Sequence, residues 1–440
     1  MGFVIRSTRV VLPDGSVDPA GVEMRDGRIA AVLPGRPRAD IDLGDLVLMP
    51  GLVDTHVHVN EPGRTEWEGF GSATRAALAG GVTTIIDMPL NSLPPTVSAE
   101  ALAAKQAAAA GQCHVDVGFW GGAIPGNAGD LAALHAAGVF GFKAFLADSG
   151  VPEFPPVTSA ELRAAMAAVD ALFLVHAEDP DRLGVSPASR VYADFESSRP
   201  GAAECSAVGA ALDAAEATGS RVHILHVSDA DAATVVEAGR ARGVRVTAET
   251  CPHYLTLDAA EVPDGATEFK CCPPIRGAAN RDRLWAALAA GGLDIVVSDH
   301  SPSTPALKHP ETGDFAAAWG GIASLQLGLP LVWTSAAARG HDLADVVRWM
   351  SSGPADLVGL HHKGRIAPGA DADLVAFDPD ATFTVRPDGL HHKHPVTPYA
   401  GRRLTGVVRR VWLGGTKVTP GDPPRGRLLT RSADLLEPAR

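Results

Sequence analysis

The sequence predicts an α/β protein built around a closed (β/α)8 barrel of the TIM type, with a small β-sandwich domain formed by both ends of the chain. Three observations lead to this prediction. Short apolar segments alternate with Ala- and Leu-rich segments through most of the chain, as in parallel βαβ units. Eight such units follow one another, which favours a barrel over an open sheet. The two ends contain only strand-like segments and are each too short for a core of their own.

The elements are expected in the following order. Near the N-terminus, strands are expected at 3–12, 22–33 and 45–49, with a tight hairpin turn at Asp26 and Gly27 because this dipeptide favours positive φ angles. The barrel strands are expected at 52–59, 83–89, 114–122, 141–146, 173–178, 221–228, 245–254 and 294–300. Helices, rich in the good helix formers Ala and Leu, are expected at 69–79, 98–110, 130–137, 159–171, 202–218, 230–241, 281–290 and 323–335.

Strand-like segments return at 372–377, 382–385 and 407–412. We therefore expect residues 1–50 and 362–420 to form one composite β-sandwich domain and residues 51–361 to form the barrel. Residues 421–440, rich in Pro and Arg, are expected to form a C-terminal arm. Two interpretations of the arm stay open, a disordered tail and a clasp between subunits.

Composition and charge exclude several classes of protein. With 38 basic and 51 acidic residues the net charge is −13, which argues against nucleic acid or an anionic membrane as a partner. The five cysteines are scattered and lack paired spacing, so they indicate neither a disulfide framework nor a zinc ribbon. The sequence shows no apolar run long enough for a signal peptide or a membrane helix. These observations predict a cytoplasmic protein.

Polar side chains stand at the C-terminal ends of the predicted barrel strands, where barrels of this kind form their active sites. They are His56, His58, Lys143, His176, His226 and Asp299. His56 and His58 are two residues apart, so in a strand they face the same side. Taken singly, such histidines are core residues as readily as ligands, and the aspartate is as readily a helix N-cap. The six positions together favour a metal site, because each lies in an apolar segment where an unpaired ionisable group is unfavourable.

Lys143 is the unusual member of the set. Burial disfavours the charged form of an amine, so a lysine in a buried strand tends to become neutral or to find a partner. A neutral amine is a nucleophile and can react with carbon dioxide to give a carbamate. The product is a carboxylate on a long stem, which can bridge two cations.

The six residues resemble the metal site of the cyclic amidohydrolases, a family that includes dihydroorotases, dihydropyrimidinases (hydantoinases) and allantoinases. The resemblance covers nearly the whole chain. It implies two divalent metal ions per subunit, bridged by N6-carboxylated Lys143 and a hydroxide. His56, His58 and Asp299 would hold the more buried ion, and His176 and His226 the other. Zinc is expected first, with cobalt, manganese and nickel left open because these ligands suit all of them. The resemblance also implies a homotetramer.

Within the family, three departures and several segments bear on the substrate. Asn60 and Ser303 stand where dihydroorotases carry an arginine and a histidine, and Asp148 stands where hydantoinases carry a tyrosine. Segments 60–70, 88–96, 270–276 and 298–303 resemble those of allantoinases. The resemblance thus implies hydrolysis of the ring amide of allantoin to allantoate, with Asp299 as general base and then general acid. Hydantoinase or dihydroorotase activity is the alternative. A non-catalytic, metal-free relative is a further one, which the complete ligand set disfavours.

Four residues are candidates for contact with the substrate. By resemblance, the backbone at Cys272 and Gly320 would hold the ring, and Arg64 and Asn91 would hydrogen-bond its carbonyl or ureido groups. Local structure is the alternative for the last two, because Asn bonds readily to its own turn and Arg64 has acidic neighbours at 61, 66 and 68.

The remaining histidines are expected to serve structure. His253 and His300 are expected to lie beside the ligands without binding metal, since His300 directly follows a ligand and should face the opposite way. The groups at 361–362 and 391–394 lie outside the predicted barrel and are interpreted as surface or junction loops.

Overall fold

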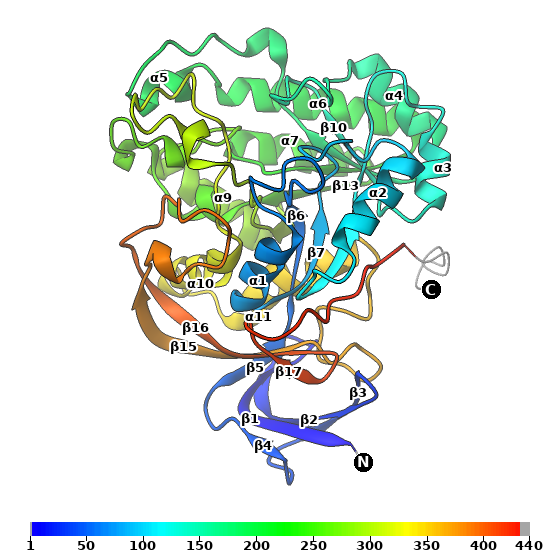
Figure 1. Cartoon of the computed structure of the whole chain (residues 1–440), viewed down its shortest axis with the longest axis vertical. Coiled ribbons are helices and arrows are strands. Elements are labelled where there is room, and N and C mark those ends of the chain that lie inside the picture. The colour runs from blue at the N-terminus through cyan, green and yellow to red at the C-terminus, as the bar shows by residue number, and fades with distance from the viewer. Residues whose placement is uncertain (1, 432–440) are drawn as a thin grey trace.

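A computed structural model describes residues 2–431 as a barrel of parallel strands with a second sheet beside it (Figure 1). The predicted barrel is confirmed. Its strands are β6 (Leu52–Val57), β7 (Val82–Asp87), β8 (Asp116–Phe119), β9 (Gly121–Gly122), β10 (Phe142–Phe145), β11 (Leu172–His176), β12 (Arg221–Ile224), β13 (Val246–Thr250) and β14 (Ile295–Val296). No helix within 2–431 is long and apolar enough to span a membrane.

Helices surround these strands (Figure 1). They are α1 (Phe70–Ala79), α2 (Ala99–Ala109), α3 (Leu131–Ala136), α4 (Ser159–Ala168), α5 (Tyr192–Ser197), α6 (Gly201–Thr218), α7 (Ala230–Ala241), α8 (Pro252–Thr256), α9 (Ala278–Ala290), α10 (Gly328–Ala338), α11 (Leu343–Val347) and α12 (Gly353–Leu357). Local sequence sets several of their ends. At α4, for example, Thr158 and Glu161 form a capping box that satisfies two backbone N–H groups.

Backbone contacts close the strands into a ring. One sheet runs β6-β7-β8 and the other runs from β9 to β14. β8 and β9 are consecutive parts of one chain segment, and Trp120 between them donates to the Asp87 carbonyl at 2.9 Å. At the other seam, His58 donates its backbone N–H to the His300 carbonyl at 2.8 Å, beside a parallel bridge from Val57 to His300. All strands therefore end on the same side of the barrel.

Both ends of the chain contribute to one eight-stranded mixed sheet, as the fold prediction requires. Its strands are β1 (Phe3–Val11), β2 (Val17–Arg25), β3 (Arg28–Pro34), β4 (Ile41–Asp42), β5 (Val47–Pro50), β15 (Leu374–Thr384), β16 (Arg403–Leu413) and β17 (Thr416–Val418). β5 joins the two contributions, because it pairs with β1 on one side and β15 on the other. The predicted turn between β2 and β3 is confirmed, with φ angles of 51° at Asp26 and 79° at Gly27.

Several predicted boundaries were wrong. The expected strand 245–254 ends at Thr250, because Pro252 begins helix α8 and proline is well suited to the first turn of a helix. The expected strand 294–300 shortens to β14, and the helix expected from 323 begins only at Gly328. The segments expected at 372–377 and 382–385 form the single strand β15, which is irregular between Asp378 and Thr382. Helix α5 was not predicted.

The first part of the predicted C-terminal arm packs against the barrel. Gly426 donates its N–H to the Cys113 carbonyl at 2.8 Å, and Leu428 forms a parallel bridge with Val117 of β8. The Arg427 guanidinium pairs with Asp116 at the start of β8. A free tail is therefore excluded for residues 426–431, while residues 432–440 lie outside the described part of the chain.

Candidate metal centre

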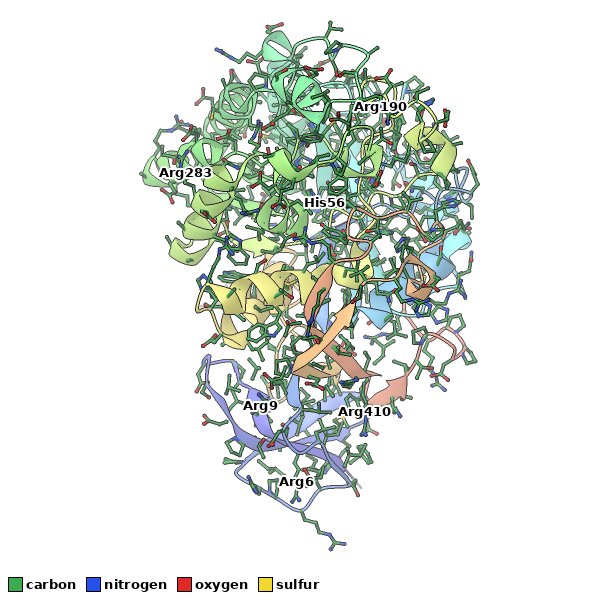
Figure 2. All side chains as sticks on the ribbon, turned by 90° about the vertical axis from the view of Figure 1, so that its left-hand side faces the viewer. Arg6, Arg9, His56, Arg190, Arg283 and Arg410 are labelled. Atoms are coloured by element: carbon green, nitrogen blue, oxygen red, sulfur yellow. The ribbon has the colours of Figure 1, made fainter. Side chains whose placement is uncertain are left out.

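The six predicted ligands converge at the C-terminal end of the barrel. His56 belongs to β6, Lys143 to β10 and His176 to β11, while the other three follow strand ends: His58, His226 and Asp299. All six are buried, none more than 8% exposed. Figure 2 shows His56 in the interior of the molecule. A cavity of about 390 Å³ opens above the group and is lined by every member except His56.

The side chains form two neighbouring groups of donor atoms. His56 Nε2 and His58 Nε2 lie 3.1 and 3.6 Å from Asp299 Oδ1. His176 Nδ1 lies 3.0 Å from His226 Nε2. Lys143 Nζ is 3.3 Å from His56 Nε2. The first three residues have donor atoms within 4.8 Å of one another, a spacing that suits one shared cation.

The electrostatics of the site favour neutral imidazoles. Burial lowers the pKa of His56 and of His58 well below the usual range, and the Lys143 amine lowers both further. Burial, together with His176 and Lys143, does the same for His226. A neutral imidazole keeps a lone pair free for a metal. Burial lowers the pKa of Lys143 and raises that of Asp299, and the attraction between these two groups opposes both shifts.

The residues present fit a pair of divalent cations. The set contains four imidazoles and one carboxylate, and both are typical ligands of zinc and related metals. On His58 and His226 the nitrogen near the other donor atoms is Nε2, while the buried Nδ1 of each ring has no hydrogen-bond partner within residues 2–431. A charged lysine among these rings would repel cations, whereas a carbamate on Lys143 would attract them.

Backbone strain is concentrated at this end of the barrel. Among the described non-glycine residues with positive φ are His226 at 37° and Asp299 at 43°. Asn60 and Asn91, on neighbouring loops, both have φ of 65°. Such conformations are unfavourable for residues with a side chain and tend to occur at functional sites.

Several buried charged residues behind the ligands were not predicted. Glu249 on β13 accepts hydrogen bonds from His56 Nδ1 and from His223 Nε2. Glu178 lies 2.8 Å from His176 Nε2 and is held by the Arg199 guanidinium. Burial raises the pKa of Glu178, but His176 and Arg199 outweigh it and lower that pKa to about 2.

The sequence signal that identified the ligands, an ionisable residue within an apolar segment, was also present for these carboxylates. Glu249 is a carboxylate within a predicted apolar strand, and Glu178 lies two residues after His176. Asp54, two residues before His56, is a further case. It accepts from the backbone N–H groups of His56 and Ser298, each at 3.1 Å, and so ties β6 to the segment after β14.

Three of the four predicted substrate contacts lie on the cavity wall, namely Asn91, Cys272 and Gly320. Arg64 is not among the lining residues. Its guanidinium donates to the Asn91 carbonyl at 2.8 Å and pairs with Glu153, not with the acidic neighbours considered from the sequence. Arg64 thus supports the Asn91 loop, and direct contact of any of the four with substrate stays a prediction.

The other polar residues of interest are structural in this arrangement. Asn60 is fully buried and donates from Nδ2 to the Pro302 carbonyl at 3.2 Å. His300 Nδ1 accepts from the Ser324 backbone at 3.1 Å, away from the cavity. His392 was interpreted as a surface or junction residue, and it is buried, with its ring 5.8 Å from that of His300. His253 is buried beside Tyr254.

Comparison with known proteins agrees with this geometry. A model of the amidohydrolase family matches residues 47–418. The chain is 56% identical over 442 residues to an allantoinase of Streptomyces avermitilis, with 98% of each chain covered. It is 44% identical to an allantoinase of Arabidopsis thaliana, covering 94% of this chain and 88% of the relative. The L-hydantoinase (dihydropyrimidinase) of Arthrobacter aurescens has a similar structure, with a TM-score of 0.90 at 30% identity over 98% of this chain and 100% of the other.

Proposed function

The chain belongs to the amidohydrolase family, and we propose that it is an allantoinase, a metal-dependent enzyme that hydrolyses the ring amide of allantoin to allantoate. The observation that carries the chemistry is the convergence of four imidazoles, Lys143 and Asp299 beside one cavity. The choice of substrate is supported by the high identity to allantoinases over the whole chain.

The residues divide into roles by position. His56, His58 and Asp299 would hold one divalent cation, and His176 and His226 a second, with Lys143 between them as an N6-carboxylate. When bound, such cations make water nucleophilic at neutral pH and polarise an amide carbonyl. We propose zinc as the metal, with cobalt, manganese or nickel as possible replacements.

We propose that Lys143 is carboxylated, and its surroundings support this proposal. Burial lowers the pKa of the amine, so part of it is neutral near pH 7 and can add to the carbon of CO2. The new N–C bond gives a carbamate, and the amine proton leaves to water. The charge of the side chain changes from positive to negative, which a site for two cations requires.

We propose that Asp299 moves the proton of the reaction. Its side chain lines the cavity, and its Oδ1 lies near Nε2 of both His56 and His58. We propose that the carboxylate accepts a proton from the attacking water and delivers it to the ring nitrogen as the C–N bond breaks. The Asn91 side chain and the backbone of Cys272 and Gly320, on the same cavity wall, would orient the ring.

The assembly and location belong to the same proposal. We propose a homotetramer, supported by the family resemblance and testable by light scattering of the purified protein. The five cysteines are all free, which suits a reducing cytoplasm.

One set of assays tests the proposed reaction. The protein, reconstituted with zinc in the presence of bicarbonate, is offered allantoin, hydantoin, dihydrouracil and dihydroorotate side by side. We expect the highest kcat/KM for allantoin, and preference for hydantoin or dihydrouracil would instead support the hydantoinase alternative. Lys143→Ala should retain the fold but not the metal, as measured by elemental analysis. Full metal occupancy in this variant would contradict the proposed bridge.

A further inference from the structure

The Glu249 carboxylate lies fully buried in the middle of the barrel and touches two of the proposed ligands. Oε1 accepts from His56 Nδ1 and also from the backbone N–H of His226 at 3.3 Å. Oε2 accepts from His223 Nε2 at 2.9 Å. One side chain on β13 therefore contacts His56 on β6 and His226 in the segment that follows β12.

These contacts determine which nitrogen of His56 faces the metal centre. A carboxylate accepts hydrogen bonds and cannot donate them, so the His56 proton is placed on Nδ1. The Nε2 lone pair is then directed at Asp299 and Lys143, the other members of the proposed site. A carboxylate behind a ligand histidine fixes its ring orientation and increases its basicity as a ligand.

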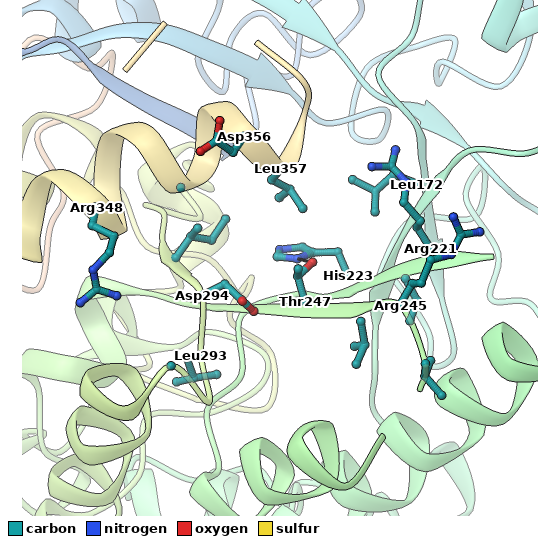
Figure 3. A pocket seen from close by; sticks show the side chains of 16 residues that line it. Leu172, Arg221, His223, Arg245, Thr247, Leu293, Asp294, Arg348, Asp356 and Leu357 are labelled. Atoms are coloured by element: carbon teal, nitrogen blue, oxygen red, sulfur yellow. Dashed lines mark hydrogen bonds between the residues drawn. The ribbon is translucent and has the colours of Figure 1, made fainter. Parts of the chain in front are cut away.

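Glu249 is itself held by a residue of the neighbouring strand β12. His223 and Thr247 are partners in the register of β12 and β13, and His223 Nδ1 lies 2.7 Å from the Thr247 hydroxyl. Glu249 is two residues beyond Thr247, so both side chains face the barrel interior. His223 and Thr247 also line a separate cavity of about 560 Å³, where Figure 3 shows them next to each other. The support thus extends through the barrel, from this cavity to His56.

Glu249 differs in this respect from the other carboxylate that bonds a ligand ring. Among the proposed ligands Glu178 contacts only His176, whereas Glu249 contacts one residue from each of the two proposed donor groups. Glu249 therefore links the two proposed donor groups, which Glu178 does not.

We propose that Glu249, supported by His223 and Thr247, is a positioning residue that fixes the metal-binding tautomer of His56 and the backbone of His226. This inference rests on the metal site proposed above. It assigns Glu249 no contact with substrate and no proton of the reaction. Its effect is to keep both donor groups in place before the metal binds.

Metal retention tests this proposal directly. Zinc-loaded parent and variant proteins are mixed with a fluorescent chelator, and the rate and extent of zinc release are followed. We expect Glu249→Leu to weaken zinc binding by about 10- to 100-fold, as is usual when the partner of a ligand is lost. Glu249→Gln should be much milder, because its amide oxygen still accepts from His56 and its amide nitrogen can donate to the other tautomer of His223. The visible spectrum of the cobalt-loaded protein should change in Glu249→Leu and be largely restored in Glu249→Gln.

Two further variants keep the test decisive if Glu249→Leu does not fold. His223→Leu removes the support from Oε2 and leaves Glu249 in place, so we expect a smaller but measurable increase in zinc release. Asp294→Asn is the matched control, because Asp294 also bonds β13, at the Ala248 N–H, but contacts no ligand. Its zinc release should equal that of the parent.

The outcomes distinguish failure of the positioning role of Glu249 from failure of the proposed metal site. Zinc release from the Glu249 and His223 variants that equals that of the parent would overturn the positioning role. An equal increase in Asp294→Asn would also overturn it, because the effect would then be general loosening of the barrel. A parent protein that binds no metal at all would instead contradict the proposed site.

Discussion

Lys363→Met is expected to destabilise the junction between the barrel and the mixed sheet. The Lys363 side chain is 1% exposed, and its Nζ lies 2.9 Å from Asp116, 3.2 Å from Asp371 and 2.7 Å from Asp373. Asp116 starts barrel strand β8, whereas the other two precede strand β15 of the sheet. One amine therefore joins three carboxylates from two parts of the fold. The three carboxylates are close enough together to hold a cation, and the Lys363 ammonium takes the place of that cation.

The size of the effect follows from what remains after the amine is removed. Arg427 still pairs with Asp116 and Asp371, at 2.6 and 2.9 Å. Asp373 still accepts a hydrogen bond from the Gly414 N–H at 2.7 Å. Within residues 2–431, no cation other than Lys363 pairs with it. One buried charge is thus left uncompensated, and removing one partner of such a pair typically costs about 3–5 kcal/mol of unfolding free energy. Three times this value is not expected, because Arg427 compensates the other two carboxylates.

Urea unfolding of the metal-loaded protein measures this loss. Asp373→Asn added to Lys363→Met should recover part of the stability, because the amide keeps an acceptor for Gly414 and removes the charge. Arg409→Met, which removes a half-exposed pair with Asp378 in the same sheet, should cost no more than about 1 kcal/mol. The reasoning is refuted if Lys363→Met costs no more than this control, or if the double variant is less stable than the single one.

The cluster also gives a pH dependence with a defined sign. Burial raises the pKa of Asp116, but Lys363 and Arg427 outweigh it and leave that pKa below its usual range. The stabilisation from Asp116 is therefore present above about pH 4, the usual range of the unfolded carboxyl, and is lost as the pH falls through the lower, folded value. In Lys363→Met, protonation instead removes the uncompensated negative charge of the buried carboxyls and so stabilises the variant. The difference in stability between parent and variant should shrink on acidification.

Three further predictions concern the site. Asp299→Asn should lower kcat by about 10²- to 10⁴-fold with an unchanged circular dichroism spectrum, and near-normal turnover would exclude its role as proton carrier. Removing the metal with a chelator should abolish allantoin hydrolysis, and zinc with bicarbonate should restore it; activity in protein shown to be metal-free would be incompatible with the mechanism. Cys272→Ser should leave kcat/KM for allantoin nearly unchanged, because only its backbone is expected to hold the ring, and a large loss would assign the thiol a role.

The sequence was most informative where side-chain direction follows from local periodicity. Strand ends carry the ligands, and in a barrel all strand ends meet on one side, so His56, His176 and Asp299 could be brought together without a structure. The mixed sheet was predictable in a weaker sense, because neither end of the chain can form a core alone. The exact ends of strands were less predictable, as at β14, which ends at Val296, three residues before Asp299 with its positive φ.

Contacts between distant segments were beyond the reach of such reasoning. Glu249 lies 193 residues from His56 in sequence, and Lys363 lies 247 residues from Asp116. Each residue is recognisable in the sequence as a charge in an apolar setting, but which partner it meets depends on strand order and register. For the same reason the structural alternative considered for Arg64, a pair with an acidic neighbour in sequence, named the wrong partner, because the fold pairs it with Glu153.

The strained ligands explain why these distant contacts matter to the site. His226 and Asp299 have positive φ, which typically costs about 1–3 kcal/mol per residue unless the surrounding structure imposes it. Glu249 holds the N–H of His226, and Asp54 holds the N–H of Ser298, next to Asp299. Each buried carboxylate also bonds His56, one at the ring and the other at the backbone. Losing either carboxylate therefore frees a strained ligand and a ring ligand together, so its effect on metal binding should exceed that of one lost hydrogen bond.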